Sequence, residues 1–309
     1  MHILFAAKDY DADRWVADFA AALPGHTVSA WRPGMAAPRA QAAIVWQPPQ
    51  ALFEQVPSLQ AVFNLGAGVD ALLDSGVLPD AVQVYRLEDA GMAVQMAEYC
   101  LYALLRAARD FGAYQAAQAR EHWLDVPPMQ RSQWPVGVLG LGAVGRRVAQ
   151  VLADFGFPVA GWSRSGAQVP GVQGYAGAQA LPQFLARTRV LVNVLPLTDQ
   201  TRDILNRDTL GRLMPGSHLI NVGRGAHLVE ADLLHALEHG PLAGATLDVF
   251  RTEPLPPGHP FWRHPAIHIT PHVAARTLHD ETIEQVAGKI RALAAGQTPS
   301  GLVERGRGY

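Results

Sequence analysis

The chain has 309 residues, of which 49% are hydrophobic and 17% charged, and its formal net charge at pH 7 is −2. This length allows two domains with separate cores, and the composition is typical of a globular protein rather than of a disordered or fibrous chain. A net charge so close to zero, with no basic run, argues against a nucleic-acid partner and against an anionic membrane surface.

The single cysteine, Cys100, excludes an internal disulfide and a cysteine-based zinc site, and its apolar helical surroundings favour a buried structural thiol over a nucleophile. The amino end reaches an acid at Asp9, too early for a secretory signal peptide. The longest uncharged stretch, between Arg164 and Arg187, contains Gly, Pro and Gln and cannot span a bilayer. We therefore expect a cytoplasmic protein without membrane contact.

The first hundred residues alternate short apolar runs with helical patterns. Residues 11–23, DADRWVADFAAAL, place an Asp near the start of apolar residues at helical spacing and predict the first connecting helix. Strands that alternate with helices predict a parallel sheet covered on both faces. The runs predicted as strands are HILFAA, HTVSAW, AAIVW, AVFNLG and VQVYRL.

The pattern from Ala93 to about His122 predicts one long helix, which could join two domains. Residues 123–135, WLDVPPMQRSQWP, lack periodicity and predict an arm or linker. A second alternating set follows, with helices predicted over 143–156 and 229–240, and a closing helix over 279–296 should return to the first domain. Its predicted strands are VGVLGL, PVAGWS, VLVNVLP, HLINVG, GATLDVF and IHITPH.

A glycine-rich loop follows the first strand of this second set. Gly140, Gly142 and Gly145 have the GxGxxG spacing between an apolar strand and a helix. In a dinucleotide-binding unit, the three would respectively permit a tight turn, let the backbone approach a pyrophosphate, and let helix and strand pack closely. N–H groups at the helix start, including those of Ala143 and Val144, would face the anion. The alternative is a glycine-rich turn in another α/β protein.

The next predicted strand ends in Ser163, Arg164 and Ser165, where a site for NAD usually has an acid. An acid would accept hydrogen bonds from the ribose hydroxyls and repel a 2′-phosphate. Arg164 can instead pair with that phosphate, and the two serine hydroxyls can donate to it. No Asp or Glu lies between Asp154 and Asp199. We therefore predict NADPH as the cofactor, with NADH less favoured; the alternative is that Arg164 is a solvated surface side chain.

Three further segments at predicted strand ends contain polar residues: NVGRG (221–225), LDVFRTEPLP (247–256) and HITPH (268–272). Together with NLGAGVD (64–70) and the glycine-rich loop, this ordered set resembles the D-isomer-specific 2-hydroxyacid dehydrogenase family over essentially the whole chain. Within the family it most resembles the glyoxylate/hydroxypyruvate reductases of the A type. WSRS, residues 162–165, contributes to that choice.

The resemblance implies an α/β fold of two Rossmann-like or flavodoxin-like domains, with parallel sheets and an active-site cleft between the domains. We predict a substrate (catalytic) domain of residues 1–97 plus 277–309 and a dinucleotide-binding domain of residues 98–276. Closure of the cleft would exclude water from the reacting groups.

The motifs fit reduction of a small 2-oxo acid, such as glyoxylate or hydroxypyruvate, to the 2-hydroxy acid by hydride transfer. Arg224 can bind both the substrate carboxylate and the carbonyl oxygen, and so polarise the carbonyl. His272 would donate the proton to the nascent alkoxide as general acid. Glu253 would hold the second imidazole nitrogen and favour the imidazolium. These three roles are the ones that the family resemblance implies.

Other residues are expected to bind the substrate. Backbone N–H groups of Ala67 and Gly68 offer a nest for the substrate carboxylate, although the same loop could serve folding alone. Trp46 and Trp123 resemble aromatic residues that restrict pocket size in the reductases, with Trp123 reaching the pocket of a partner subunit. Either tryptophan could instead belong to the core or to an interface.

The resemblance also implies cofactor contacts beyond the glycine-rich loop. Asp248, at the end of a predicted strand, would contact the nicotinamide carboxamide. Leu195, Pro196 and Val222 would lie along the cofactor. The resemblance further implies a homodimer formed through the long helix and the arm.

Other functional interpretations of the sequence fit less well. HALEH, residues 235–239, matches a zinc-protease pattern, but Gly240 and Pro241 end that helix at once, so we predict no metal site. A 3-hydroxyacid dehydrogenase would need a catalytic lysine, and neither Lys8 nor Lys289 lies in a suitable segment. The alternatives that stay open are a non-catalytic dinucleotide-sensing protein on the same fold and a reductase for bulkier 2-oxo acids.

Overall fold

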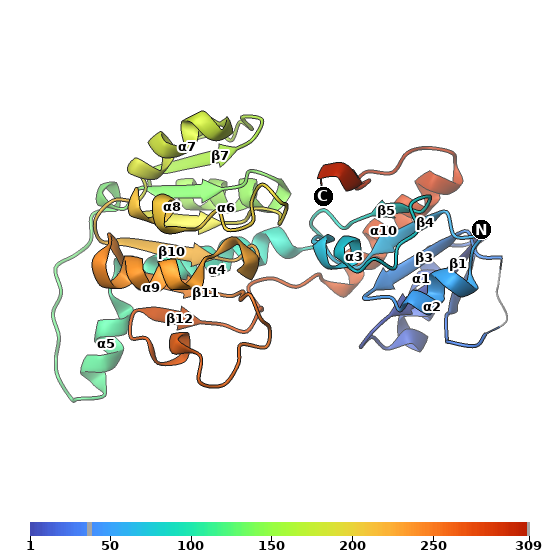
Figure 1. Ribbon diagram of the computed structural model, residues 1–309, viewed down its shortest axis with the longest axis horizontal. Coiled ribbons are helices and arrows are strands. Elements are labelled where there is room, and N and C mark those ends of the chain that lie inside the picture. Colours follow the sequence, from blue (N-terminus) through green and yellow to red (C-terminus); the bar gives the residue numbers. More distant parts are fainter. Residues whose placement is uncertain (36–38, 308–309) are drawn as a thin grey trace. The chain divides into compact units, whose positions relative to one another are not determined.

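The computed structural model of the chain describes residues 1–35 and 39–307. The chain forms two compact units, one of residues 1–91 and 277–309 and the other of residues 92–276 (Figure 1). Each unit is built on its own parallel β-sheet with helices on both faces. The predicted α/β class with two parallel sheets is therefore confirmed.

The sheet of the smaller unit has five parallel strands in the order β2-β1-β3-β4-β5. All five correspond to the predicted apolar runs. The predicted first helix, α1 (Ala12–Ala22), follows β1, and the side chain of Asp11 caps it by accepting a hydrogen bond from the Arg14 N–H. The strands are β1 (His2–Ala7), β2 (Thr27–Ala30), β3 (Ala42–Trp46), β4 (Ala61–Asn64) and β5 (Gln83–Tyr85).

Alternate residues of these strands face two separate cores. Ile3 and Phe5 pack with residues of α1 and of the closing helix α10 (His279–Ala294), whereas Leu4 packs on the other face with α2 (Gln50–Gln55) and α3 (Asp70–Asp74). This is the alternation expected of a sheet that is buried on both sides.

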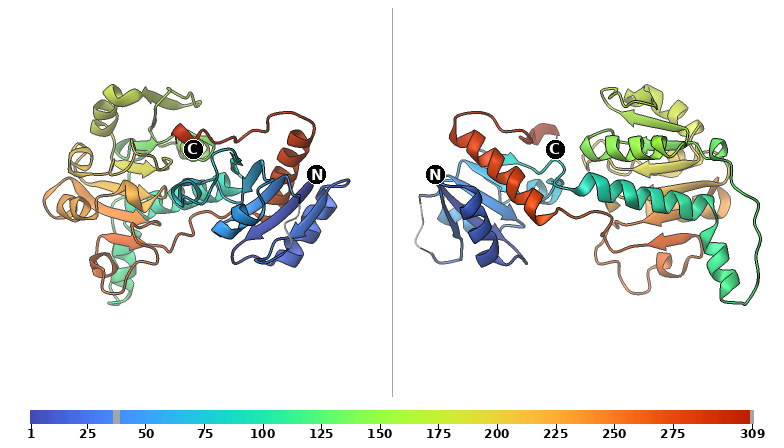
Figure 2. Two further views of the ribbon diagram at one scale, coloured as in Figure 1. Left: turned by 45° about the vertical axis from the view of Figure 1, so that its right-hand side comes forward. Right: turned by 180° about the vertical axis from the view of Figure 1, so that it is seen from behind.

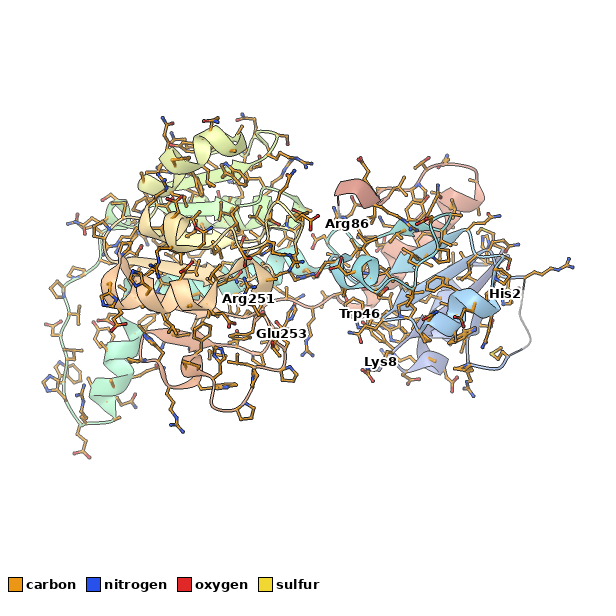
Figure 3. The ribbon with its side chains drawn as sticks, in the orientation of Figure 1. His2, Lys8, Trp46, Arg86, Arg251 and Glu253 are labelled. Atoms are coloured by element: carbon orange, nitrogen blue, oxygen red, sulfur yellow. The ribbon has the colours of Figure 1, made fainter. Side chains whose placement is uncertain are left out.

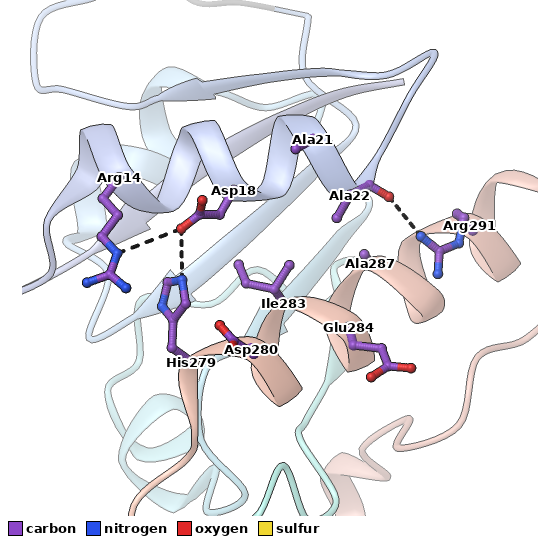
Figure 4. Close-up of a pocket in the computed structure, with 10 residues that line it drawn as sticks. All are labelled: Arg14, Asp18, Ala21, Ala22, His279, Asp280, Ile283, Glu284, Ala287 and Arg291. Atoms are coloured by element: carbon purple, nitrogen blue, oxygen red, sulfur yellow. Dashed lines mark hydrogen bonds and ion pairs between the residues drawn. The ribbon is translucent and has the colours of Figure 1, made fainter.

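The two helices α1 and α10 lie side by side, as predicted for a chain that returns to its first unit (Figure 4). The carboxylate of Asp18 lies 2.8 Å from Nε2 of His279, and Nη1 of Arg291 donates to the carbonyl of Ala22 at 2.8 Å. These polar contacts line a shallow groove between the helices.

The sheet of the larger unit has seven parallel strands in the order β12-β11-β10-β9-β6-β7-β8. Six of them are the predicted strands, and β8 is an additional strand at one edge, where most of its residues are exposed. The strands are β6 (Val136–Leu139), β7 (Val159–Ser163), β8 (Val172–Ala176), β9 (Val190–Asn193), β10 (Ser217–Asn221), β11 (Leu242–Leu247) and β12 (Ile267–Ile269).

Helices cover both faces of this sheet. On one face α4 (Met92–Ala108) and α6 (Ala143–Asp154) pack against each other and on the strands (Figure 2). On the other face lie α7 (Gly177–Ala186), α8 (Arg207–Gly211) and α9 (Glu230–His239). Cys100 of α4 is fully buried among apolar side chains, and this burial raises the pKa of its thiol, as expected of a structural cysteine.

The prediction of one continuous helix from Ala93 to His122 is wrong. Helix α4 ends at Ala108, and a separate helix, α5 (Phe111–Gln118), follows (Figure 2). Between them Asp110 has φ = 53°, in the left-handed region, which interrupts the helical hydrogen bonding. The two helices also differ in burial. Helix α4 packs on α6, whereas Ala117 is the one buried residue of α5, so little packing holds α5 in line with α4. The following arm has no regular structure except a short 3₁₀ turn at Arg131–Gln133.

Within the described ranges, no helix is both long and apolar enough to cross a lipid bilayer.

Candidate active site

In the larger unit, the chain turns in opposite directions from two adjacent central strands, β6 and β9. At such a reversal the segments that follow the two strands diverge and leave a crevice, where open α/β sheets bind ligands. The glycine-rich loop follows β6, and Leu195 and Pro196 follow β9. Leu195 is buried and Pro196 is exposed.

Each glycine of the loop has a separate structural reason. Gly140 has φ = 99°, which strongly favours glycine. A Cβ atom on Gly145 would lie 1.9 Å from the carbonyl oxygen of Gly140, so α6 could not approach the loop with any larger residue there. A Cβ atom on Gly142 would have no protein atom within 4 Å, so this side of the loop is open.

The amino end of α6 opens from the same loop. Gly142 is the N-cap residue, and no side chain among the described residues caps this end. The first N–H groups of the helix, including those of Ala143 and Val144, have no partner within the helix, and the helix dipole gives them partial positive charge. This end therefore fits an anionic group such as a pyrophosphate.

The turn after β7 is held by Ser163. Its Oγ accepts hydrogen bonds from the N–H groups of Gly166 and Ala167, both at 3.0 Å. The side chains of Arg164 and Ser165, which follow, are exposed at the end of the strand. Arg164 and Ser165 are thus the exposed polar side chains of this strand end, whereas Ser163 is buried and holds the turn.

The ends of β10 and β11 meet at Gly225. A Cβ atom there would lie 1.8 Å from the carbonyl carbon of Phe250, so only glycine lets the two strand-end loops pack this closely. The neighbouring Arg224 is half-buried, and its Nη1 donates to the carbonyl of Gly223 at 2.8 Å. Val222, just before these residues, is buried.

The predicted pair of Glu253 and His272 forms a hydrogen bond. Oε2 of Glu253 lies 2.7 Å from Nδ1 of His272, and Oε1 of Glu253 accepts from the Phe250 N–H at 2.9 Å (Figure 3 labels Glu253). Because this bond engages Nδ1, Nε2 is the ring atom that can exchange a proton with a ligand.

Electrostatics favour the ion pair. The hydrogen bond to Glu253 raises the pKa of His272, against burial and the cation of Arg224, which lower it. Burial alone would raise the pKa of Glu253, but the hydrogen bonds from His272 and Phe250, together with the positive charges of His272 and Arg224, lower that pKa. The charge of Arg224 acts on both groups, so the structure brings these three predicted residues into one electrostatic environment.

Asp248 holds the segment that contains His272. Its carboxylate, 1% exposed, accepts hydrogen bonds from the hydroxyl of Thr270 at 2.6 Å and from the N–H groups of Val273 and Ala274 at 2.9 Å. The N–H of His272, which has φ = 54°, donates to the carbonyl of Asp248 at 2.8 Å. Together these bonds hold His272 in a left-handed conformation that is uncommon for residues other than glycine.

Tyr99 of α4 adds a further hydrogen bond to the Asp248–Thr270 pair. Its hydroxyl lies 2.6 Å from Oγ1 of Thr270. Because the Thr270 hydroxyl gives its proton to Asp248, Tyr99 is the donor in its own bond to Thr270. Burial is the main cause that raises the pKa of Tyr99, which keeps the phenol protonated as this bond requires.

The smaller unit contains the other predicted substrate residues. Buried Asn64 donates from Nδ2 to the carbonyls of Gly66 and Gly68, both at 3.0 Å, and so shapes the NLGAGVD loop. No acceptor among the described residues takes the N–H groups of Ala67 and Gly68. These groups are therefore available to an anion.

Trp46, which Figure 3 labels, lies at the end of β3. A Cβ atom on Gly66 would lie 2.5 Å from Cζ3 of Trp46, so the indole lies directly against that glycine. Trp123, in the arm of the larger unit, is instead 94% exposed.

The histidines of the HALEH segment stack on each other. The rings of His235 and His239 are 5.0 Å apart, and His239 lies 3.7 Å from its neighbour Glu238. No group of three or more His, Cys, Asp or Glu residues that could hold a metal ion occurs in the part of the chain that the structure describes.

Five polar residues near the site were not predicted as part of it: Tyr99, Asn193, Asn221, His227 and Thr270. Asn193, Asn221 and Thr270 follow apolar strand residues at the same sheet edge as Arg224, and this position is a signal that sequence can supply. Tyr99 and His227 have no such signal, because their contacts depend on segments distant in the chain.

Comparison with known proteins agrees with this geometry. Residues 101–274 match the family described as D-isomer specific 2-hydroxyacid dehydrogenase, NAD binding domain. The chain is 49% identical to glyoxylate/hydroxypyruvate reductase A of Serratia proteamaculans and 45% identical to the protein of that name from Yersinia enterocolitica. Both alignments cover 100% of each chain.

Solved structures are similar over the same length. A D-isomer specific 2-hydroxyacid dehydrogenase from Xanthobacter autotrophicus, in complex with NADPH and MES, is 40% identical with a TM-score of 0.94. An NADPH-dependent glyoxylate/hydroxypyruvate reductase from Sinorhizobium meliloti, in complex with NADP and sulfate, is 35% identical with a TM-score of 0.91. In both comparisons 100% of this chain and 99% of the other are covered.

Proposed function

The chain belongs to the D-isomer specific 2-hydroxyacid dehydrogenase family, and we propose that it is an NADPH-dependent reductase of small 2-oxo acids such as glyoxylate and hydroxypyruvate. It is an oxidoreductase by family. The observation that carries the proposed reaction is the hydrogen bond between Glu253 and Nδ1 of His272, two groups on which the charge of Arg224 also acts. The names of its reductase relatives support the substrate class.

The site residues would act as follows. Arg224 binds the substrate carboxylate and polarises the carbonyl oxygen, where negative charge develops. When bound, the reduced nicotinamide supplies the hydride that adds to the carbonyl carbon. His272 donates the proton from Nε2 to the developing alkoxide, and Glu253 stabilises the imidazolium before that transfer. In the oxidative direction His272 takes the proton back as a base.

A direct test follows NADPH absorbance with glyoxylate or hydroxypyruvate as substrate. We expect turnover by the wild type and a loss of about 10²- to 10⁴-fold in kcat for His272→Asn, which removes the general acid. Tight NADPH binding without turnover of either acid, or of bulkier 2-oxo acids, would instead indicate a dinucleotide-sensing protein.

The larger unit would be the dinucleotide-binding domain, predicted at 98–276, and the smaller unit the substrate domain. The open loop at Gly142 and the uncapped start of α6 fit the pyrophosphate, and the side chains of Ser163, Arg164 and Ser165 fit a 2′-phosphate. Asp248 would contact the nicotinamide carboxamide. The NADPH and NADP bound in the Xanthobacter and Sinorhizobium structures support the choice of cofactor.

The preference for NADPH is tested at Arg164. Arg164→Ala should lower kcat/KM for NADPH by about tenfold or more and leave that for NADH nearly unchanged, because only NADPH has the 2′-phosphate. Arg263→Ala, which removes another exposed arginine, is the control and should change neither value. An unchanged NADPH/NADH preference in Arg164→Ala would defeat this assignment.

The NLGAGVD loop would bind the substrate carboxylate through the N–H groups of Ala67 and Gly68. Trp46, which packs on this loop, would limit the length of the substrate. If Trp46→Ala has the same ratio of kcat/KM values for glyoxylate and longer 2-oxo acids as the wild type, Trp46 does not have that role.

A homodimer is part of the proposal. Tyr102, Phe111 and Trp123 are exposed on α4, α5 and the arm, and a groove runs between α5 and Trp123. Large aromatic side chains that are this exposed are typical of interfaces between subunits. Light scattering coupled to size-exclusion chromatography should give the mass of two chains.

A further inference from the structure

We propose that His227 is a positioning residue, which holds the backbone of Arg224 in place through a neutral imidazole. The inference rests on the proposed role of Arg224 in binding the 2-oxo acid. His227 is fully buried at the end of a 3₁₀ turn (Gly225–His227), so it does not touch the substrate and acts only through its neighbours.

The hydrogen bonds of the ring determine its protonation state. Nδ1 of His227 lies 2.9 Å from Nδ2 of Asn193 and 3.1 Å from the backbone N of Arg224. Both partners are donors, so Nδ1 must be the acceptor. Nε2 lies 3.2 Å from the carbonyl oxygen of Pro196, which can only accept. One form of the ring satisfies all three contacts: the neutral tautomer with its proton on Nε2.

Two buried asparagines complete the network. Nδ2 of Asn193 donates to Oδ1 of Asn221 at 2.9 Å, and Nδ2 of Asn221 donates to the carbonyl of Arg224 at 3.3 Å. The N–H of Arg224 is therefore held by His227 and its C=O by Asn221. Neither asparagine is exposed to water, which would otherwise compete for these bonds.

The network joins the two strand-end segments that the proposed site needs. Through Pro196 it reaches the loop after β9, and through Arg224 it reaches the loop after β10. The backbone N–H and C=O of Arg224 are therefore both hydrogen-bonded, and its guanidinium donates to the Gly223 carbonyl. A displacement of about 1 Å in such a group can cost about 10²-fold in rate, so this backbone restraint matters for catalysis.

Substitutions at His227 separate the hydrogen bonds of its two ring nitrogens. His227→Phe keeps a ring and removes both polar atoms. His227→Asn keeps an acceptor near the position of Nδ1, whereas His227→Gln keeps a polar group near the position of Nε2. We expect kcat/KM for the 2-oxo acid to fall by about 10- to 100-fold in His227→Phe. KM for the 2-oxo acid should rise more than KM for NADPH, and His227→Asn should retain more activity than His227→Gln.

The matched control is His218→Phe. His218 is also a buried histidine, but it lies at the amino-terminal end of β10 and bonds to Oγ1 of Thr246 at 3.0 Å. This variant should melt at a lower temperature with its KM for the 2-oxo acid unchanged. An equal rise of KM in His218→Phe would show a general effect of losing a buried hydrogen bond and would overturn the proposal.

A double substitution tests whether His227 acts through Arg224. In an Arg224→Ala background, His227→Phe should lower kcat/KM by less than about twofold, because the group that it positions is already absent. A full additive loss would overturn the proposal. If His227→Phe does not fold, the activities of the other two variants decide. A higher kcat/KM in His227→Asn than in His227→Gln supports the proposal, and the reverse order overturns it.

Nuclear magnetic resonance separates this inference from the proposed function. In long-range ¹H–¹⁵N correlations of histidine-labelled protein, the ring whose signal is lost in the folded His227→Asn variant should have its proton on Nε2 and an unprotonated Nδ1. A charged ring, or a proton on Nδ1, would overturn the network even in an active enzyme. The expected signal in a protein that reduces no 2-oxo acid would leave the network intact and refute the proposed reaction instead.

Discussion

At the scale of single residues, the charge state of one histidine controls the proposed chemistry. Reduction needs the imidazolium of His272, and the hydrogen bond from Glu253 raises the pKa of that ring. The proton is therefore present below the raised pKa and is lost as the pH rises through it. Reduction of 2-oxo acids should accordingly be fastest on the acidic side of this pKa and decline above it, whereas oxidation should show the opposite trend.

Glu253→Gln tests this relation. Glutamine keeps a neutral acceptor for Nδ1 but removes the negative charge, which weakens the interaction that most raises the pKa of His272, so the decline of kcat/KM for reduction should move to lower pH. At neutral pH the loss of kcat should be smaller than the loss of about 10²- to 10⁴-fold expected for His272→Asn. A pH profile that is unchanged in Glu253→Gln, measured where chemistry limits the rate, would contradict the pairing.

At the scale of elements, the junction of β6 and α6 shows why glycines with the same motif spacing are not equivalent. Gly145 is required by packing, because Gly140 leaves no room for a side chain on α6. Gly142 meets no protein atom, so its lack of a side chain serves no packing purpose in the protein itself. This difference supports the proposed binding of the cofactor pyrophosphate beside Gly142.

Gly142→Ala and Gly145→Ala form a matched pair. Gly145→Ala should destabilise the fold by about 1–3 kcal/mol or more, because the added methyl overlaps backbone. Gly142→Ala should unfold near the wild-type temperature but raise the Kd for NADPH by about tenfold or more. Thermal unfolding and cofactor titration measure the two effects, and equal NADPH affinity in the wild type and Gly142→Ala would argue against a pyrophosphate at this loop.

At the scale of the whole molecule, the chain leaves its first unit at residue 91 and returns at residue 277. Helix α10 completes the core of strands from the start of the chain: Val286 and Ile290 are buried in one core with Ile3 and Phe5, which precede them by more than 280 residues. The smaller unit is therefore complete only after the larger one has been synthesised. Each unit nevertheless has its own cores.

Separate cores predict separate responses to core substitutions. Ile290→Ala should destabilise the smaller unit by about 2–5 kcal/mol, and Leu219→Ala should do the same in the larger unit, since both side chains are fully buried. Hydrogen exchange should show faster opening of β1 and β3 in the first variant and of β9 and β10 in the second. Equal loss of protection in both units from either substitution would show that they unfold as one.

Most strands, the parallel sheets and the three glycines were predictable from sequence, because each depends on local periodicity or on a motif; the pairing of Glu253 with His272 was implied by the family resemblance. Tertiary structure alone decided that the long helix breaks at Asp110, that an exposed edge strand forms at 172–176, and that His227 meets Asn193 and Pro196. The break and the edge strand depend on which surfaces find a packing partner. The contacts of His227 join segments 31 and 34 residues apart, a distance over which local sequence pattern contains no information about hydrogen bonds.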